Sequence, residues 1–373
     1  MKRYLLFVIV VFNLFLSCRN TKQGDLLEIP VDIDQINPLK LSEITEELMA
    51  IELELTDESL INPDLISRII LCSNELIIAE SFKIFVFSKD GKFLRTIGSR
   101  GQGPGEYISI NNISIDEKNK YLYIISSSKI ICYNLNGKFL HETYNNTASF
   151  SEIIFFNDKI FLVGQKGSND EEKGFCMNSA LYRYSNDFRF IDSIFIRNTI
   201  IGNFTSLAFV GTNGDFLFNY NSNVYLYFPN NFLVIGSNSA NIILADTLYC
   251  IDNNQLIPEL KLKFKDNGID KGGNKFIDIF NIYKSSRYIF SKYENKLNDN
   301  SIMYFFCYDT KTRKSYNMID GYIDDIHQIE KPVKIRPFNL DTEMFYYLHT
   351  NIKPDDKEEP NPTLYIGKLK TKN

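Results

Sequence analysis

The chain alternates short apolar segments with polar turns, and one such unit occurs twice. KIFVFSKDGKFLRTIG occupies residues 83–98, and KIICYNLNGKFLHETY occupies residues 129–144. Each copy reads as a strand, a two-residue Asp-Gly or Asn-Gly turn and a second strand, which predicts a β-hairpin. The second copy begins 46 residues after the first (129 − 83). That period is typical of a four-stranded propeller blade.

The same unit recurs four more times along the chain. Each further copy is a strand-forming segment, and all but the last precede a polar turn: ALYRYSNDF, TLYCIDNNQ, MYFFCYDTKT and, near the end of the chain, TLYIGKLK. The distances between copies are the size of a blade, with room for loop insertions. Six copies predict an all-β fold, a six-bladed β-propeller.

The two ends of the chain predict how the ring closes. Little chain follows the last copy, whereas the strand IELEL at residues 51–55 is left over near the N-terminus. If IELEL is the outer strand of the last blade, beside TLYIGKLK, no long sheet edge stays free. Residues 41–50 mix acidic and apolar side chains at helical spacing, which predicts a short helix before this strand.

Composition narrows the class of protein further. The chain has 22 Tyr, 30 Phe and no Trp, with a formal net charge of −5 and a pI near 5.5. Tyr, Phe and Ile favour strands, so the bias argues against a helical protein. The sequence contains no Lys/Arg-rich run, which argues against nucleic acid as a partner.

The first residues read as a targeting segment rather than as part of the fold. Lys2 and Arg3 precede an apolar run at residues 4–16, which is short for a stable transmembrane span. The run ends at Ser17-Cys18, which resembles the lipobox of bacterial lipoproteins, although Phe15 replaces the usual Leu. This resemblance implies a signal peptide at residues 1–17, a lipid on Cys18 that anchors the chain in the membrane, and a tether at residues 18–40. An ordinary secretory signal with a chance cysteine is the alternative.

The remaining cysteines predict neither a disulfide nor a metal site. Cys132, Cys250 and Cys307 occupy the same place in three copies of the repeat, just before the outgoing turn. Equivalent positions on different blades lie beyond disulfide reach, so we expect all three to be unpaired and buried.

The sharpest local motif is GSRGQGPGEY at residues 98–107, between the first two blades. Its glycines allow turns with positive φ, and its backbone N–H groups near Arg100 could hold an anion. It lacks the Gly-Lys-Ser/Thr of a P-loop, and strands rather than a helix flank it. Arg100, Glu106 and Tyr107 are therefore the candidate binding loop. The alternative is a structural corner between blades, in which Glu106 ties down the loop.

The segment that contains this motif, DGKFLRTIGSRGQGPGEYISINNISID, resembles the NHL-type propeller repeat. Across its length the chain resembles the six-bladed β-propeller lipoproteins, NHL/TolB-like in fold, of gut-type diderm bacteria. The matching points are Cys18, GQGPGEY, YNLNGKFL, ADTLYCIDNNQLIPELKLKF and NPTLYIGKLK. The resemblance implies a propeller at residues 41–373, secretion and lipid anchoring at the outer membrane, on its periplasmic or outer face. It implies no established activity and therefore no catalytic residue, cofactor or metal.

Two classes of function stay open from the sequence. The three histidines, His141, His327 and His349, stand alone, and no catalytic motif is visible. The first class is a non-catalytic lipoprotein that presents a propeller face to a glycan, peptide or protein partner. The second is a hydrolase or lyase with a dispersed site at the channel mouth, with or without a metal ion, which a motif search would miss. Inward carboxylates, Asn and His at one mouth would favour the enzyme, and an apolar mouth would favour binding.

Overall fold

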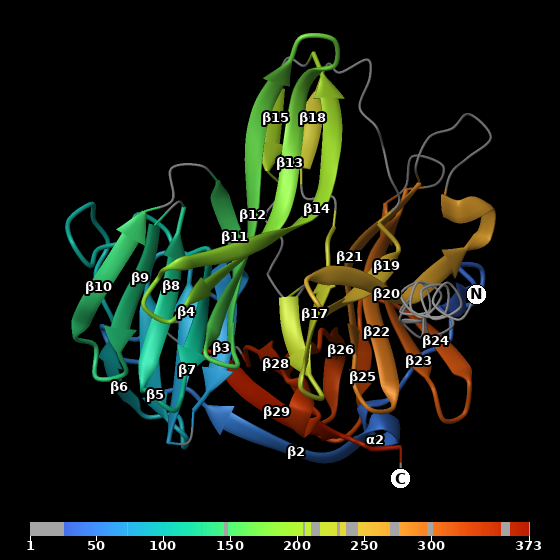
Figure 1. Cartoon of the computed structure of the whole chain (residues 1–373). Helices are drawn as coiled ribbons and strands as arrows, with labels where there is room; N and C mark the ends of the chain where they lie inside the picture. Colours follow the sequence, from blue (N-terminus) through green and yellow to red (C-terminus); the bar gives the residue numbers. More distant parts are fainter. Residues whose placement is uncertain are drawn as a thin grey trace, which may run out of the picture.

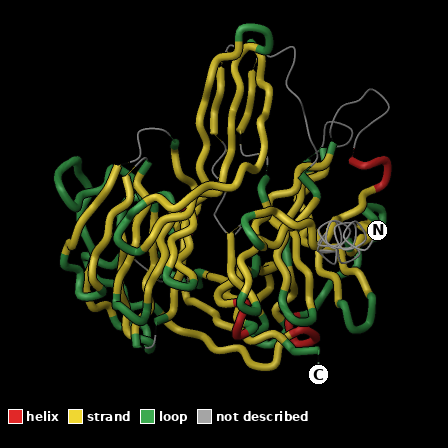
Figure 2. The backbone as a smooth tube through the Cα atoms, viewed as in Figure 1, coloured by secondary structure: helices red, strands yellow, loops and turns green. Residues whose placement is uncertain are grey.

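The structure is a computed structural model, and it shows six small β-sheets arranged in a ring (Figures 1 and 2). It describes residues 26–72, 74–127, 129–144, 148–203, 206–209, 217–229, 232–235, 245–268, 276–296, 301–351 and 359–372. The predicted six-bladed β-propeller is confirmed. Among the described residues, no helix is long and apolar enough to span a membrane.

Each sheet is one blade, built mainly from consecutive antiparallel strands. Blade 1 contains β3 (Ile66–Leu71), β4 (Glu75–Glu80), β5 (Ile84–Ser88) and β6 (Phe93–Thr96), and blade 2 contains β7 (Asn112–Asp116), β8 (Tyr121–Ser126), β9 (Lys129–Asn134) and β10 (Phe139–Tyr144). Blade 3 contains β11 (Ser149–Phe156), β12 (Lys159–Asp170), β13 (Gly174–Ser185) and β14 (Phe190–Gly202). Blade 4 contains β16 (Leu217–Tyr220), β17 (Asn223–Tyr227), β19 (Thr247–Asp252) and β20 (Gln255–Phe264). Blade 5 contains β21 (Ile277–Lys284), β22 (Tyr288–Asn295), β23 (Ile302–Asp309) and β24 (Lys314–Ile319).

Blade 6 joins the two ends of the chain, as the sequence predicts. It contains β27 (Arg336–Asn339), β28 (Met344–His349) and β29 (Thr363–Leu369), and its fourth strand is β2 (Thr45–Glu52). β2 pairs antiparallel with β29, and Ile51 lies opposite Leu364. The strand at the N-terminus therefore covers the edge of the last blade and closes the ring.

The bounds of the closing strand differ from the prediction. Only α2 (Leu41–Ile44) is helical within residues 41–50, and the strand begins at Thr45. The prediction of a helix over these residues is wrong because pairing with β29 supplies the backbone hydrogen bonds and overrides a helical spacing of side chains. In the following segment only the first two residues of IELEL belong to the strand.

Part of the predicted tether also belongs to the propeller. β1 (Leu27–Val31) pairs parallel with β20 and adds a fifth strand to blade 4. Ile29 and Val31 point inward and are buried, while Leu27 is exposed, which is the alternation of an edge strand. Pro30 lacks an N–H, and an edge strand accommodates this because one of its sides stays unpaired. The predicted signal peptide and Cys18 lie outside the described residues.

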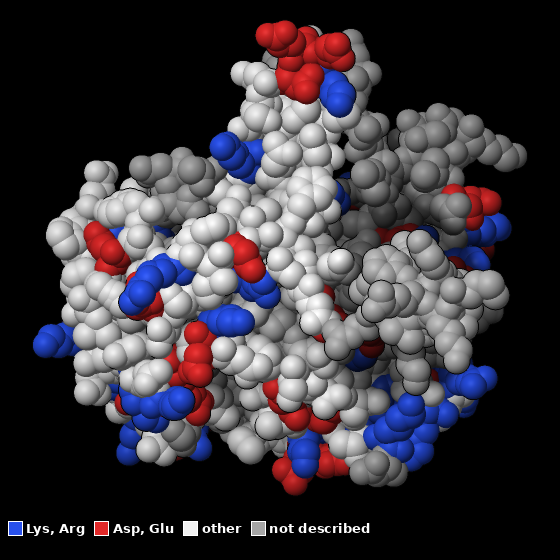
Figure 3. Space-filling view, in the orientation of Figure 1, with Lys and Arg blue, Asp and Glu red and all other residues white. Residues whose placement is uncertain are grey.

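Blade 3 extends beyond the ring as an arm (Figure 1). Its strands β12, β13 and β14 are 12, 12 and 13 residues long, and a separate pair, β15 (Ser206–Phe209) and β18 (Phe232–Ile235), lies beside them. Figure 3 shows acidic side chains at the tip of the arm. A smaller pair, β25 (Tyr322–Asp324) and β26 (Ile329–Val333), lies between blades 5 and 6 in the chain.

The six copies of the repeat are the third strands of the six blades, β5, β9, β13, β19, β23 and β29. Cys132, Cys250 and Cys307 lie on three of them and are unpaired, as predicted. Cys132 and Cys307 are fully buried, whereas Cys250 is only partly buried. The common place in the repeat therefore gives a common strand but not the same burial.

Candidate ligand-binding site at the mouth of the central channel

A cavity of about 450 Å³ opens where the first strands of the blades end. Five of these strands contribute to its wall: β3, β7, β11, β16 and β27. Most of the lining side chains are apolar, among them Ile70, Leu71, Ile115, Phe155 and Phe338. The cavity is therefore the mouth of the central channel, and its wall combines one strand from each of five blades.

β-bulges change which side chains face this cavity. In β3 the pairing with β4 shifts between Ile66 and Arg68. In β11 the pairing with β12 shifts between Phe150 and Glu152. A bulge inserts one extra residue and turns the next side chain to another direction. Both first strands thus resume their pairing on a charged residue.

Arg68 and Glu152 come from different blades and form an ion pair. Arg68 Nη1 lies 3.9 Å from Glu152 Oε2, and their side chains are 21% and 0% exposed. A carboxylate that is fully removed from water requires a nearby cation, because the cost of burying an isolated charge is several kcal/mol. The pair therefore fixes the Arg68 side chain while leaving part of it accessible.

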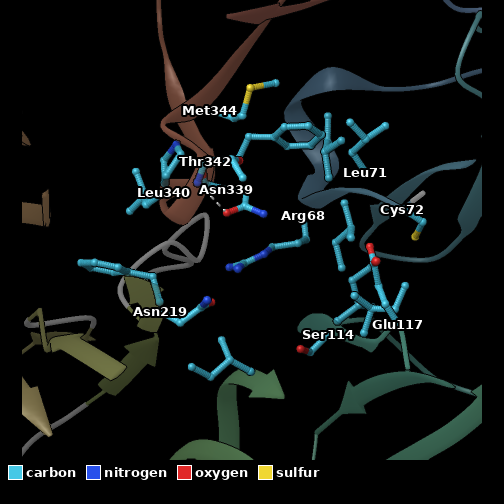
Figure 4. A pocket seen from close by; sticks show the side chains of 18 of the residues that line it. Arg68, Leu71, Cys72, Ser114, Glu117, Asn219, Asn339, Leu340, Thr342 and Met344 are labelled. Carbon is cyan, nitrogen blue, oxygen red and sulfur yellow. Dashed lines mark hydrogen bonds between the residues drawn. The ribbon is translucent and has the colours of Figure 1, made fainter. Parts of the chain in front are cut away.

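Arg68 points into the cavity between Asn219 of β16 and Asn339 of β27 (Figure 4). Both asparagines are held in place by their neighbours. Asn219 Nδ2 donates to Asp341 Oδ2 at 2.6 Å, and Asn339 Oδ1 accepts from Thr342 N at 3.3 Å. The centre of the cavity is thus one guanidinium with a fixed carboxamide on either side.

Further cations lie next to this wall. Arg336 at the start of β27 donates to Ile66 O at 3.3 Å and to Ser67 O at 3.1 Å, so it lies against β3. Burial lowers the pKa of Lys292, and the positive charges of Lys334 and Arg336 lower it further. These contacts place several positive charges near blades 5, 6 and 1, which favours an anionic group in the channel.

The cysteine in the cavity wall is not an activated nucleophile. Burial raises the pKa of the Cys72 thiol to about 12, and the charge of Glu117 adds to this effect. A thiol with such a pKa is protonated at neutral pH and reacts slowly. Among the residues that the structure describes, no group of three or more His, Cys, Asp or Glu side chains could hold a metal ion.

The predicted binding loop lies elsewhere, at the corner between blades 1 and 2. Tyr107 is buried, and its hydroxyl donates to Ile97 O at 2.9 Å. Glu106 Oε2 accepts from Gly103 N at 2.8 Å, and the Arg100 guanidinium lies 4.6 Å from the centre of the Phe82 ring. These contacts belong to a structural corner, the alternative that the sequence offered. None of the three predicted residues lines the channel cavity, and their role in binding stays a prediction.

A buried ion pair fastens this corner to blade 2. Lys129 Nζ donates to Gly103 O and Glu106 O, both at 2.9 Å, and lies 2.7 Å from Glu142 Oε2. Burial alone would raise the pKa of Glu142, but the hydrogen bonds from Lys129 and Gly105 outweigh it and lower the pKa. The glycine-rich segment therefore directs backbone carbonyls at a lysine, in addition to the amides that an anion site would need.

The ring of six blades and the apolar channel mouth define the chain as a six-bladed β-propeller of the ligand-binding type of architecture. Residues 26–372 match the family described as "Domain of unknown function (DUF4934)", and the chain belongs to that family. No curated protein matches the sequence.

Solved structures share the fold at low sequence identity. A crystal structure of a "Putative exported protein" from Bacteroides fragilis NCTC 9343 is 18% identical and has a TM-score of 0.64. The match covers 93% of this chain and 100% of that one. The WD40 domain of Neurospora crassa Pan2 is 10% identical, with a TM-score of 0.44 and coverage of 89% and 88%. A protein of unknown function from Bacteroides caccae is 13% identical, with a TM-score of 0.38 and coverage of 78% and 90%.

Proposed function

We propose that the protein is an exported lipoprotein of the bacterial outer membrane that binds a ligand at the mouth of its propeller channel without catalysing a reaction. The apolar signal core and the Ser17-Cys18 pair support export and lipidation. The similar Bacteroides fragilis structure, itself described as a "Putative exported protein", supports export as well. The NHL/TolB-like lipoproteins that the sequence resembles fit the same proposal.

The composition of the channel mouth carries the proposal. Its wall is mainly apolar, and one cation, Arg68, stands at the centre between two carboxamides. A concave, mostly apolar site with a few fixed polar groups is the usual form of a ligand pocket. The ligand that fits combines an apolar body with one acidic group, as a peptide, a glycan or a segment of a partner protein can provide.

Binding to arrays of peptides and of glycans, followed by calorimetry on every hit, tests the proposal. The informative variant is Arg68→Gln/Glu152→Gln, because it removes the central cation without leaving a buried carboxylate alone. Arg313→Gln on the exposed turn between β23 and β24 is the matched control. We expect the double variant to lose about tenfold or more in affinity, as for a charge-assisted hydrogen bond. Equal affinity of the double variant and the control would place the binding site outside the channel mouth.

A further inference from the structure

A second cavity, of about 740 Å³, lies between blades 3 and 4. Strand β14 forms one wall, and strands β19 and β20 with the turn between them form the other. It shares no lining residue with the channel mouth. A binding event here would therefore be separate from one in the channel.

Arg197 of β14 lies in this cavity with an incomplete set of partners. Its Nη2 donates to Pro229 O at 2.8 Å, and its guanidinium lies 4.5 Å from the centre of the Phe228 ring. Its Nε is buried and has no hydrogen-bond acceptor in the described part of the chain. Burial lowers the pKa of Arg197 to about 10, and its nearest acidic neighbours are the hydroxyls of Tyr227 and Tyr249. These hydroxyls are neutral at pH 7, so the positive charge is removed from water without a negative charge beside it.

Other partly buried arginines of the outer strands have the acid that Arg197 lacks. Each of them is held by both oxygens of one carboxylate: Arg95 by Glu75, Arg183 by Asp192 and Arg287 by Asp309. This forked contact is the arrangement that best satisfies a guanidinium. The difference at Arg197 is therefore a missing carboxylate, and the side that lacks it faces a cavity.

We propose that this cavity binds a sugar acid and that the ligand's carboxylate supplies the missing partner of Arg197. The remaining wall suits the rest of such a ligand. Phe195 is 63% exposed at the rim, and an aromatic face packs well on the apolar face of a pyranose ring. Asp246, Thr247 and Gln255 provide side-chain oxygens and an amide that can bind hydroxyl groups. A peptide terminus offers the same carboxylate but no set of hydroxyls.

The polar part of the wall is already held in position. Asp246 accepts from Thr247 Oγ1 at 2.8 Å and lies 3.3 Å from Lys261 Nζ. Arg183 of blade 3 donates to Asn254 Oδ1 in the turn between β19 and β20, which joins the two walls. Side chains that are fixed before the ligand arrives lose little entropy on binding. The site therefore does not need to form around its ligand.

Calorimetry with a trimer of galacturonic acid and the purified mature chain tests the proposal. We expect binding that Arg197→Gln weakens by about tenfold or more. Arg197→Lys should weaken it as well, because a lysine keeps the charge but loses the fork. Arg189→Gln is the matched control, since Arg189 is 82% exposed and pairs with Asp187 outside the cavity. The uncharged galactose trimer should bind about tenfold or more weakly than the acid.

Several outcomes would overturn the proposal. One is a folded Arg197→Gln protein that binds the acidic trimer as the wild type does, and another is no binding of the trimer at all. Binding of a short peptide through its free carboxylate, dependent on Arg197, with no binding of the trimer would replace the sugar acid by a peptide end. If Arg197→Gln fails to fold, Phe195→Ala at the exposed rim takes its place, and unchanged affinity of that variant would count against the sugar.

Discussion

Two equivalent glycines allow a direct test of how the ring closes. Gly91 and Gly137 occupy the same turn of the repeat in blades 1 and 2, with φ values of +87° and +86°. Their surroundings differ. A Cβ on Gly91 would lie 2.0 Å from Glu52 O, at the end of the closing strand, whereas the nearest atoms to a Cβ on Gly137 are 3.8 Å away. The change Gly91→Ala therefore disturbs the closing strand, and Gly137→Ala does not.

The expected magnitudes follow from these contacts. Both variants place alanine at positive φ, which costs about 1–2 kcal/mol. At Gly91 the added methyl group also has to displace the Glu52 carbonyl from 2.0 Å to at least 3.4 Å, a shift of about 1.4 Å. Overpacking of this kind costs about 1–3 kcal/mol more. We expect Gly91→Ala to be less stable than Gly137→Ala by that second amount.

Urea unfolding measures the difference. Far-UV circular dichroism and tyrosine fluorescence serve as probes, since the chain has no Trp. Amide hydrogen exchange then locates the damage: β2 and β29 should lose protection in Gly91→Ala and keep it in Gly137→Ala. Equal unfolding midpoints for the two variants, or equal protection of β2, would refute the idea that the turn at Gly91 supports the closing strand.

Three further predictions concern the anchor, the buried pair and the response to acid. Cys18→Ala should move the protein from the membrane to the soluble fraction, whereas a variant that stays in the membrane unprocessed would exclude lipidation. Arg68→Gln should cost about 3–5 kcal/mol because it leaves Glu152 buried without its cation, and Glu152→Gln should cost less, which urea unfolding will show. Hydrogen bonds, chiefly from Arg287, outweigh burial and lower the pKa of Asp309 to about 2. Its stabilising effect should therefore be present above pH 4 and be lost as the pH falls towards 2, and Asp309→Asn should flatten unfolding curves over that range.

The sequence predicts the repeated part of the fold well because one turn carries a clear signal. The turn between the third and fourth strands contains Asp-Gly or Asn-Gly in blades 1 and 2, and the glycine of each has positive φ. Aligning on that turn identifies the third strand of every blade and the pairing of Ile51 with Leu364. The first strands have no comparable turn, so they escape the alignment. β1 escapes it as well, since its five residues pair with a strand more than 200 residues away.

The channel site is harder to predict because it depends on distant residues and on pairing defects. Arg68 lies within the strand ISRIIL, where a lone charge reads as the exposed side of an edge strand. Its partner Glu152 lies two blades further along the chain, in a strand that also reads as apolar. Only the closed ring brings the two first strands to the same channel, and only the bulges turn the two side chains towards each other.

The bulges nevertheless share a feature that sequence reading can use. Four of the six first strands are bulged, and each resumes its pairing on a polar residue: Arg68, Glu152, Asn281 and Asn339. The residue skipped by the pairing is Ser or Phe in each case, in the segments ISR, FSE, IFN and PFN. A regular strand would keep these polar side chains in the alternation of its neighbours, whereas one extra residue shifts the alternation by one position. A polar residue just after Ser or Phe, early in the first strand of a blade, is therefore the local signal for a side chain that enters the apolar wall of this channel.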